Sequence, residues 1–299
     1  MLLGVPFLIG VIMSIRLMSH NVWNNDNNSP AWQEKGEDCS AKVRSDGLVR
    51  VYKEKMPDVI GFQEMTALMS DLLVEKCAES GIKYTLIWGR FTPVMYRSDK
   101  LDLIETHFYT YPDTIDGFEG EFNDVRSKSF TTAVFREKQS GKKFVFTTTH
   151  LWWMYNADTE EQAKIHGYRF HSDDARKIQL SLAMKTTVES AQKHDCPAFI
   201  VGDLNAEYNS KAVSHALTNG FKHAHDIATE YADETMGYHW CFANRYETEY
   251  YDKPFECAID HILVHEAERV EVKRFERYSP DYYFPISDHS PVIADIELK

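Results

Sequence analysis

Short apolar runs recur along this chain, and several end abruptly in carboxylates, amides and histidines. The clearest examples are Gln63-Glu64, Thr149-His150, Gly202-Asp203-Leu204-Asn205 and Ser287-Asp288-His289. Apolar runs of this length are typical of buried β-strands, and a strand end is where a rigid sheet can present polar side chains together. No serine or cysteine in these clusters has a setting that suits a nucleophile. The residue types suit a divalent cation and a phosphate instead.

The order of the expected elements predicts an α/β fold. Strands are expected at 15–20, 59–63, 85–88, 94–97, 101–109, 130–136, 144–149, 198–202, 259–264, 270–277 and 291–298, and helices at 41–55, 66–80, 173–192 and 210–219. Two mixed sheets packed face to face, with helices on the outer faces, would explain this order. The strands at 130–136 and 144–149, joined through Ser140-Gly141, form a predicted hairpin. Because no linker divides the chain, residues 13–299 are expected to form one domain.

The first residues differ from the rest of the chain. Met1 to Met13 is apolar, lacks the basic start of a secretory signal and is too short to span a bilayer. The first core strand is expected immediately after it. We therefore expect translation to start at Met13, with residues 1–12 a mis-called start or an extension. A degenerate signal or membrane anchor is the alternative.

Composition limits the partners. The 299 residues are 43% hydrophobic, which is ordinary for a soluble globular protein, and the formal net charge is −13. This charge disfavours loose attraction to nucleic acid or anionic membrane, although a local basic groove stays open. The five cysteines include no CxxC pair, so buried free thiols in a reducing compartment, the cytoplasm, are expected.

Two residues near the first strands suit a cation. Glu64 follows the strand at 59–63, where a carboxylate can bind Mg²⁺. Taken alone, it would more often be a first-turn charge of the next helix. Asn21 follows the first strand, where its amide could orient Glu64 or a metal-bound water. In its Asn-rich surroundings it could equally be a turn residue.

Three residues suit phosphate chemistry. Asp203 and Asn205 are two positions apart in an extended segment, so their side chains share one face. The aspartate could orient or deprotonate a water, and the amide could donate a hydrogen bond to a phosphate oxygen. His150 ends another strand and could donate to the phosphate or to the leaving group.

A histidine and two carboxylates complete the set. Asp288 and His289 are adjacent, so their side chains should diverge, the first toward a metal and the second toward phosphorus. The histidine needs an acceptor that fixes its ring. Asp260 lies within an apolar strand, and a buried carboxylate is rarely left unpaired. A His289–Asp260 pair would satisfy both residues.

Two long aromatic segments, 152–171 and 237–251, interrupt the strand and helix patterns, and long loops in a compact domain are usually functional. Histidines outside the site clusters are expected to be surface or packing residues. Among them, four flank the site, and a packing role is still favoured for each: His166, His171, His239 and His261.

Taken together, the motifs resemble the endonuclease/exonuclease/phosphatase superfamily, whose members include DNase I. The matching segments, in the family's order, are 17–23, 57–64, 149–151, 202–205, 259–262 and 287–292. The resemblance implies a four-layer α/β sandwich and Mg²⁺- or Mn²⁺-dependent hydrolysis of phosphoesters. Position by position, it implies that Glu64 binds the metal with Asn21 and Asp288 near it.

The same resemblance implies roles for the remaining residues. Asp203 would position the attacking water, Asn205 and His150 would bind the phosphate, and His289 with Asp260 would act as an acid/base or charge-stabilising pair. Arg176 and Gln179 match the family's R-x-x-Q helix and would be structural. The chain departs from simpler members in its aromatic segment at 152–171 and in His261, where tyrosine is common.

The leading hypothesis is a metal-dependent phosphodiesterase or phosphatase in which water attacks a phosphoester in line. A DNA or RNA nuclease is the first alternative, which the net charge weakly disfavours. A non-catalytic binding module on the same scaffold would be expected to lose site residues, and this chain keeps them. No stable membrane insertion is expected. The physiological substrate, the number of metals and the oligomeric state are not indicated by any motif.

Overall fold

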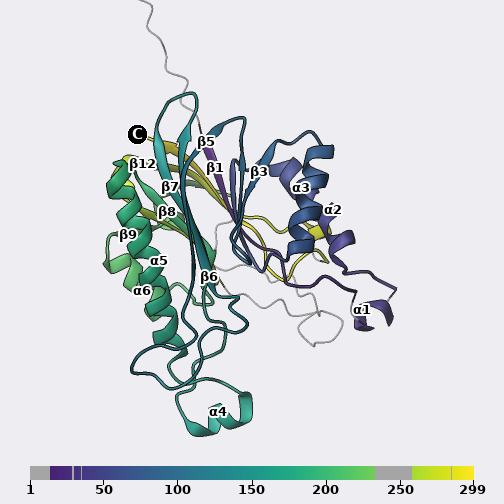
Figure 1. Ribbon diagram of the computed structural model, residues 1–299, viewed down its shortest axis with the longest axis vertical. Coiled ribbons are helices and arrows are strands. Elements are labelled where there is room, and N and C mark those ends of the chain that lie inside the picture. Colours follow the sequence, from purple (N-terminus) through teal and green to yellow (C-terminus); the bar gives the residue numbers. More distant parts are fainter. Residues whose placement is uncertain (1–13, 29, 35, 233–257, 284) are drawn as a thin grey trace, which may run out of the picture.

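Two mixed β-sheets lie face to face, and helices cover their outer faces (Figure 1). The computed structural model describes residues 14–28, 30–34, 36–232, 258–283 and 285–299. The predicted start at Met13 and the aromatic segment 237–251 lie outside these residues. Within them, the first sheet has the order β10 (Ala228–Tyr231), β12 (Val270–Arg277), β13 (Val292–Leu298), β1 (Ile15–Asn21), β2 (Val59–Gln63), β4 (Val94–Arg97) and β3 (Tyr84–Ile87).

The second sheet packs on the first. Its order is β5 (Leu101–Thr110), β6 (Ser129–Glu137), β7 (Lys143–His150), β8 (Ala198–Asp203), β11 (Asp260–His265) and β9 (Phe221–His223). The pairs β1–β2 and β7–β8 are parallel, whereas β6–β7 is the predicted antiparallel hairpin. The described helices are α1 (Pro30–Glu34), α2 (Ala41–Lys55), α3 (Ala67–Glu79), α4 (Glu160–His166), α5 (Ser172–His194), α6 (Lys211–Thr218) and α7 (Ala224–Ile227).

The three largest apolar clusters among the described residues hold the layers together. Leu17, Phe146 and Val201 are buried in the cluster between the two sheets. A second cluster lies under α2 and α3, and a third lies under α5 and α6. The result is the expected helix–sheet–sheet–helix sandwich. Among the described residues, no helix combines the length and apolar character that crossing a bilayer requires.

Most predicted elements lie where the sequence placed them, including the helix Ala41–Lys55. The exceptions are short. The segment 221–231 holds β9, α7 and β10, and the aromatic segment 152–171 contains α4 rather than loop alone. Cys39, Cys77 and Cys196 are buried free thiols, as expected; Cys241 and Cys257 lie outside the described residues.

A buried arginine ties the loops at one edge of the first sheet. Arg44 on α2 is 2% exposed, and its guanidinium donates to backbone carbonyls on three separate segments. The acceptors are the carbonyl oxygens of Cys39 (2.9 Å), Val22 (2.6 Å), Ile286 (2.8 Å), Trp23 (3.1 Å) and Asn25 (2.5 Å). The loop after β1 and the segment before β13 are therefore fixed relative to each other.

Two buried histidines support the loop after β8. The Nε2 of His261 lies 2.7 Å from the carbonyl oxygen of Ala206, so this nitrogen carries a proton and donates. Its Nδ1 then accepts from Nε2 of His223 at 2.9 Å, and Nδ1 of His223 accepts from the backbone N–H of His225. Both rings are thus satisfied in the neutral form. Burial, with nearby positive charge, lowers the pKa of His261 to about 4 and that of His223 well below its usual value.

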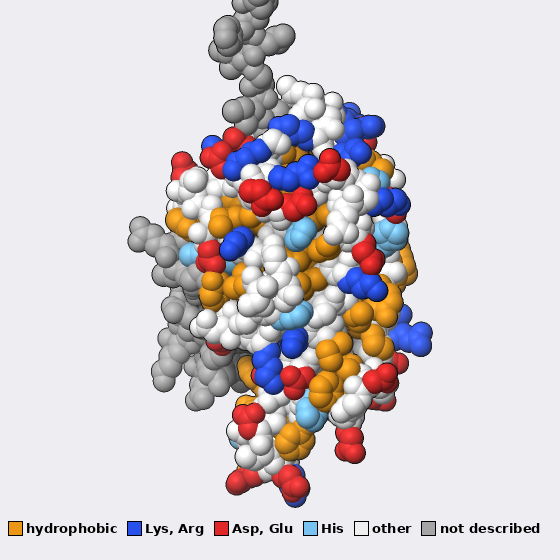
Figure 2. All heavy atoms as spheres, turned by 90° about the vertical axis from the view of Figure 1, so that its left-hand side faces the viewer, with side chains coloured by type: hydrophobic (Ala, Val, Ile, Leu, Met, Phe, Trp, Pro, Cys, Tyr) orange, Lys and Arg blue, Asp and Glu red, His pale blue; other side chains and the backbone are white. Residues whose placement is uncertain are grey.

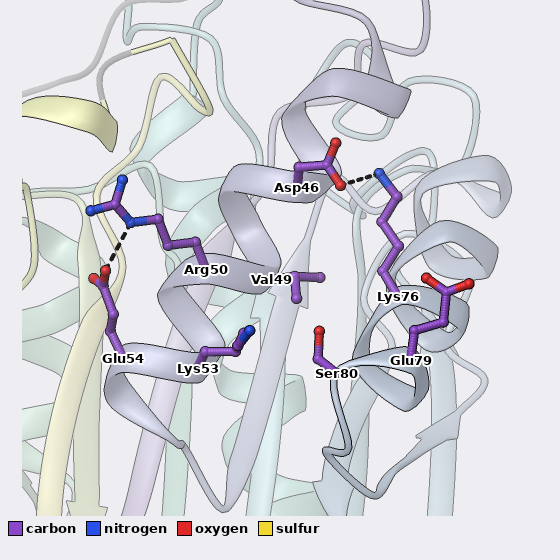
Figure 3. A pocket seen from close by; sticks show the side chains of 8 residues that line it. All are labelled: Asp46, Val49, Arg50, Lys53, Glu54, Lys76, Glu79 and Ser80. Atoms are coloured by element: carbon purple, nitrogen blue, oxygen red, sulfur yellow. Dashed lines mark hydrogen bonds and ion pairs between the residues drawn. The ribbon is translucent and has the colours of Figure 1, made fainter.

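We predict that Arg44→Lys lowers the free energy of unfolding by on the order of 3 kcal/mol, because an ammonium cannot satisfy all five carbonyls and buried acceptors left unpaired are costly. Urea unfolding measures the change. Arg50→Lys is the matched control, since Arg50 lies on the exposed side of the same helix and pairs with Glu54 (Figure 3). Equal losses in the two variants would contradict the role of Arg44.

The histidine pair should make stability fall in acid. Each neutral ring takes up a proton in the unfolded chain near pH 6.5, so stability is complete above that pH and declines below it by about 1.4 kcal/mol per pH unit and per group. Between pH 6 and 4.5, we expect His223→Gln to reduce the slope of the free energy of unfolding against pH by about 1.4 kcal/mol per pH unit, which is the contribution of one histidine. Urea unfolding across this pH range measures the slope. An unchanged slope would show that His223 has the same pKa in the folded and the unfolded chain.

Candidate active site

Strand pairing in the second sheet places three polar residues side by side. His150 ends β7 and pairs with Asp203 at the end of the parallel strand β8. On the other side of β8, Asp203 pairs with Asp260 at the start of the antiparallel strand β11. Neighbouring strands lie about 4.8 Å apart. The sheet alone therefore brings these residues together at one edge.

The first sheet contributes its own strand ends at the same edge. Asn21 ends β1 and pairs with Gln63 of β2, and Glu64 follows directly. The Nδ2 of Asn21 donates to Oδ2 of Asp203 at 3.0 Å, which joins the two sheets. Glu64 has a φ of 59°, and its Oε2 accepts from the backbone N–H of Asn24 at 2.9 Å. This bend directs its carboxylate toward His150, with Oε1 3.9 Å from Nε2.

The turn after β8 requires particular residues. A Cβ at Gly202 would lie 2.0 Å from the carbonyl oxygen of Thr149, so only glycine fits beside β7 here. Asn205 has a φ of 47°, which asparagine tolerates better than most residues. Its backbone N–H donates to Oδ1 of Asp203 at 2.9 Å, and its Nδ2 donates to the carbonyl oxygen of Leu151 at 3.1 Å. Together with the hydrogen bond from Asn21 to Oδ2, the backbone contact of Asn205 holds both carboxylate oxygens of Asp203 in place.

The predicted His289–Asp260 pair is present. Nδ1 of His289 lies 2.7 Å from Oδ2 of Asp260, and Nε2 lies 3.8 Å from Oδ2 of Asp203. Burial alone would lower the pKa of His289, but the charges of Asp260 and Asp203 raise it well above its usual value. The ring is therefore held protonated between two carboxylates.

The carboxylates at this edge are crowded. Burial raises the pKa of Asp203 to about 7, and the charge of Asp260 adds to the effect. Burial also raises the pKa of Asp288 to about 6, and the charge of Glu64 adds to that. Ligand atoms of Glu64, His150 and Asp203 lie within 4.8 Å of one another. An oxygen-rich set with excess negative charge fits a hard divalent cation.

Lys128 also belongs to this site, although no sequence pattern predicted it. Its side chain is buried, and Nζ lies 3.0 Å from Nε2 of His150. Burial lowers the pKa of Lys128, while the charges of Glu64, Asp124 and Asp203 oppose this. Burial also lowers the pKa of His150 well below its usual value, with further lowering by Lys128 and His289. The neutral imidazole can accept a hydrogen bond from the ammonium.

A cavity of about 360 Å³, here named the catalytic cavity, opens over these groups. Its walls include Phe91, Val125 and Trp153 beside the polar groups. Of the eight predicted site residues, five line it: Glu64, His150, Asp203, Asn205 and His289. The other three do not line the cavity but interact with residues that do. Asn21 forms a hydrogen bond with Asp203, and Asp260 forms one with His289. The charge of Glu64 contributes to the raised pKa of Asp288.

Helix α5 supports the wall of this cavity. Gln179 accepts from the backbone N–H of Trp152 at 2.8 Å and donates to the carbonyl oxygen of Phe122 at 2.8 Å. Arg176 donates to the carbonyl oxygens of Trp152 (3.1 Å) and Met154 (2.8 Å). Both side chains bind backbone and lie outside the polar cluster, which agrees with a structural role.

Comparison with known proteins identifies the family. The sequence matches the Endonuclease/Exonuclease/phosphatase family over residues 18–289. No curated protein matches it. An endonuclease/exonuclease/phosphatase from Bacteroides vulgatus is similar in structure, with 23% identity, a TM-score of 0.68, and coverage of 96% of this chain and 100% of that one.

Two further structures share the fold at low identity. A mannosyl-6-phosphatase from Bacteroides thetaiotaomicron has 18% identity and a TM-score of 0.68, covering 94% of this chain and 99% of its own. TDP2 from D. rerio, complexed with a single strand DNA product, has 16% identity and a TM-score of 0.63, covering 95% and 99%. With its sheet order, its strand-end site and the family match over most of its length, the chain belongs to the endonuclease/exonuclease/phosphatase family.

Proposed function

We propose that this protein is a divalent-cation-dependent phosphoester hydrolase in which water attacks phosphorus in line. The observation that carries the proposal is the position of His289, whose Nδ1 lies 2.7 Å from Oδ2 of Asp260 and whose Nε2 is directed toward Asp203 in a cavity that Glu64 also lines. Membership of a family of phosphoesterases and nucleases supports the reaction class.

Glu64 would hold Mg²⁺ or Mn²⁺ together with Asp288, whose pKa is raised in part by the charge of Glu64. Asp203 and His150, whose ligand atoms lie within 4.8 Å of that of Glu64, have separate roles. When bound, such an ion would neutralise the charge that develops on the phosphoryl oxygens. Asn21 was expected to be close to the metal. Because its Oδ1 accepts from the backbone N–H of Trp23 and its Nδ2 donates to Asp203, we assign it the orientation of Asp203 instead.

Asp203 would receive the hydrogen bond of the attacking water. Its two oxygens already accept from the backbone N–H of Asn205 and from Nδ2 of Asn21, so the carboxylate cannot rotate freely. A carboxylate fixed in this way can orient a water and accept its proton as the bond to phosphorus forms.

Cationic and amide groups would stabilise the phosphoryl group as its charge increases. His289 can donate through Nε2, and Lys128 can donate through Nζ, with His150 holding the ammonium by a hydrogen bond. We thus assign His150 the orientation of Lys128, whereas it was expected to bind the phosphate directly together with Asn205. Asn205 lines the same cavity. Loss of one preorganised donor typically costs about 10²–10³ in rate.

A nuclease is the second candidate. It is favoured by the half-exposed Trp153 and exposed Tyr155 beside the site, on which bases could stack. It is disfavoured by the net charge of −13 and by the described side chains in Figure 2, where basic and acidic groups are interspersed rather than gathered in one stripe. The structures that share the fold agree with either candidate, since one is named a mannosyl-6-phosphatase and another is complexed with a single strand DNA product.

The proposal is tested by hydrolysis of bis-p-nitrophenyl phosphate, sugar phosphates, nucleotides and plasmid DNA with Mg²⁺ or Mn²⁺, and again with EDTA. We expect turnover of at least one small phosphoester that EDTA abolishes and added metal restores. Hydrolysis of DNA but of no small phosphoester, with activity that falls steeply as the salt concentration rises, would favour the nuclease. Hydrolysis that is indifferent to EDTA would remove the metal from the proposal.

Asp203→Asn and His289→Gln should each retain the fold and lose at least about 10² in kcat, because each removes an interaction made with the reacting groups. Circular dichroism verifies the fold, and phosphate release measures the rate. Asp102→Asn and His107→Gln are matched controls on the exposed strand β5. Near-parental kcat in either site variant would refute its assigned role.

Lys128→Met should lower kcat/KM for a small phosphomonoester by about 10²–10³, whereas Lys128→Arg should recover part of it, because a cation near the phosphoryl oxygens is retained. Lys138→Met is the control, since Lys138 is an exposed lysine that directly follows the far end of β6. If Lys128→Met folds and keeps parental kcat/KM, the lysine has a packing role only.

A further inference from the structure

A cavity of about 440 Å³, here named the side cavity, adjoins the catalytic cavity. Trp153 and Asn205 line both of them, so the two cavities are immediate neighbours. We propose that the side cavity binds a neutral polyhydroxylated ring, and that the substrate is a sugar phosphate whose phosphoryl group lies in the catalytic cavity. This inference rests on the proposed phosphoester hydrolase function.

Exposed aromatic rings form one wall of the side cavity. Trp153 is 48% exposed and Tyr155 is 58% exposed, and both rings lie beside the cavity. The indole is fixed, because its Nε1 donates to Oδ2 of Asp124 at 2.9 Å and its ring packs on Trp152. The face of an aromatic ring is electron-rich, and the C–H face of a pyranose is the complementary surface.

The polar lining favours a ligand that donates hydrogen bonds. Asp173, Glu207 and Asn209 bring carboxylate and amide oxygens to the side cavity. Sugar hydroxyl groups can donate hydrogen bonds to such oxygens. A site with these acceptors discriminates strongly against analogues that lack the hydroxyl groups.

The same lining disfavours a second phosphate. Among the described lining residues the one cation is Arg176, and its guanidinium is already engaged by Asp173 and by the carbonyl oxygens of Trp152 and Met154. The described lining therefore offers no further cation to a second phosphate, which a continuing nucleic acid strand or a nucleoside polyphosphate would bring, whereas a neutral ring needs none.

The side cavity is rigid and small. Arg176 and Gln179 of α5 hold the backbone of the aromatic segment, so the wall does not need to be ordered when a ligand binds. Its volume lies at the lower end of the range for small-molecule sites, which suits one sugar ring rather than a chain.

The test compares a hexose 6-phosphate (that of glucose, mannose or fructose) with ethyl phosphate, which carries the same type of primary ester without a ring. We expect the parent protein to prefer a hexose phosphate, and a free hexose to inhibit hydrolysis of ethyl phosphate competitively. Trp153→Ala should raise KM for the hexose phosphate by about tenfold relative to ethyl phosphate. Tyr155→Ala and Asn209→Ala should act in the same direction.

Trp88→Ala is the matched control, because Trp88 is 66% exposed and lines a different cavity beside Phe91. Equal effects of Trp153→Ala on both esters, no inhibition by any free hexose, or a preference for a nucleotide would overturn the sugar assignment while ethyl phosphate hydrolysis upholds the proposed function. Absence of metal-dependent hydrolysis of every ester would instead overturn the proposed function, and the inference with it.

Discussion

The site depends on the close approach of the two sheets at the edge where their central strands end. At Gly61 of β2, an added Cβ would lie 2.6 Å from Cβ of Thr148 and 2.7 Å from Val201, so any larger residue would force the sheets apart. At this spacing the amide of Asn21 can reach Asp203 of the other sheet. A small increase in separation would break this hydrogen bond and move Glu64 away from His150.

The positions of the site residues at strand ends could be predicted from sequence. His150, Asp203 and Asp260 border apolar runs, and strand periodicity alone places such residues at sheet edges. The pairing of His289 with Asp260 also followed, because a buried carboxylate needs a partner and few candidates are available. What periodicity could not supply is the pairing register, which decides that these residues share one edge rather than opposite edges.

Features that arise from tertiary contact alone were missed. Lys128 stands before a strand with no pattern of its own, yet in the hairpin register Ser129 pairs with His150 and so sets Lys128 beside the site. The short elements at 221–231 exist because β9 and β10 complete the sheet edges, and four-residue segments carry too little sequence signal. His261 and His223 satisfy each other, which neither position reveals separately.

The distribution of charge explains how an acidic protein can hold a phosphoester. The net charge is −13, but cations at the site edge are buried and oriented by specific partners: Arg44 by backbone carbonyls, Lys128 by His150, and His289 by Asp260. A buried cation acts at short range in a medium of low dielectric constant, whereas the surface charge is screened within about 10 Å by salt. In the proposed hydrolase, attraction would therefore be confined to one phosphoryl group inside the catalytic cavity. A long polyanion would also meet a protein of net charge −13, so the proposed arrangement would favour a single phosphate over an extended substrate.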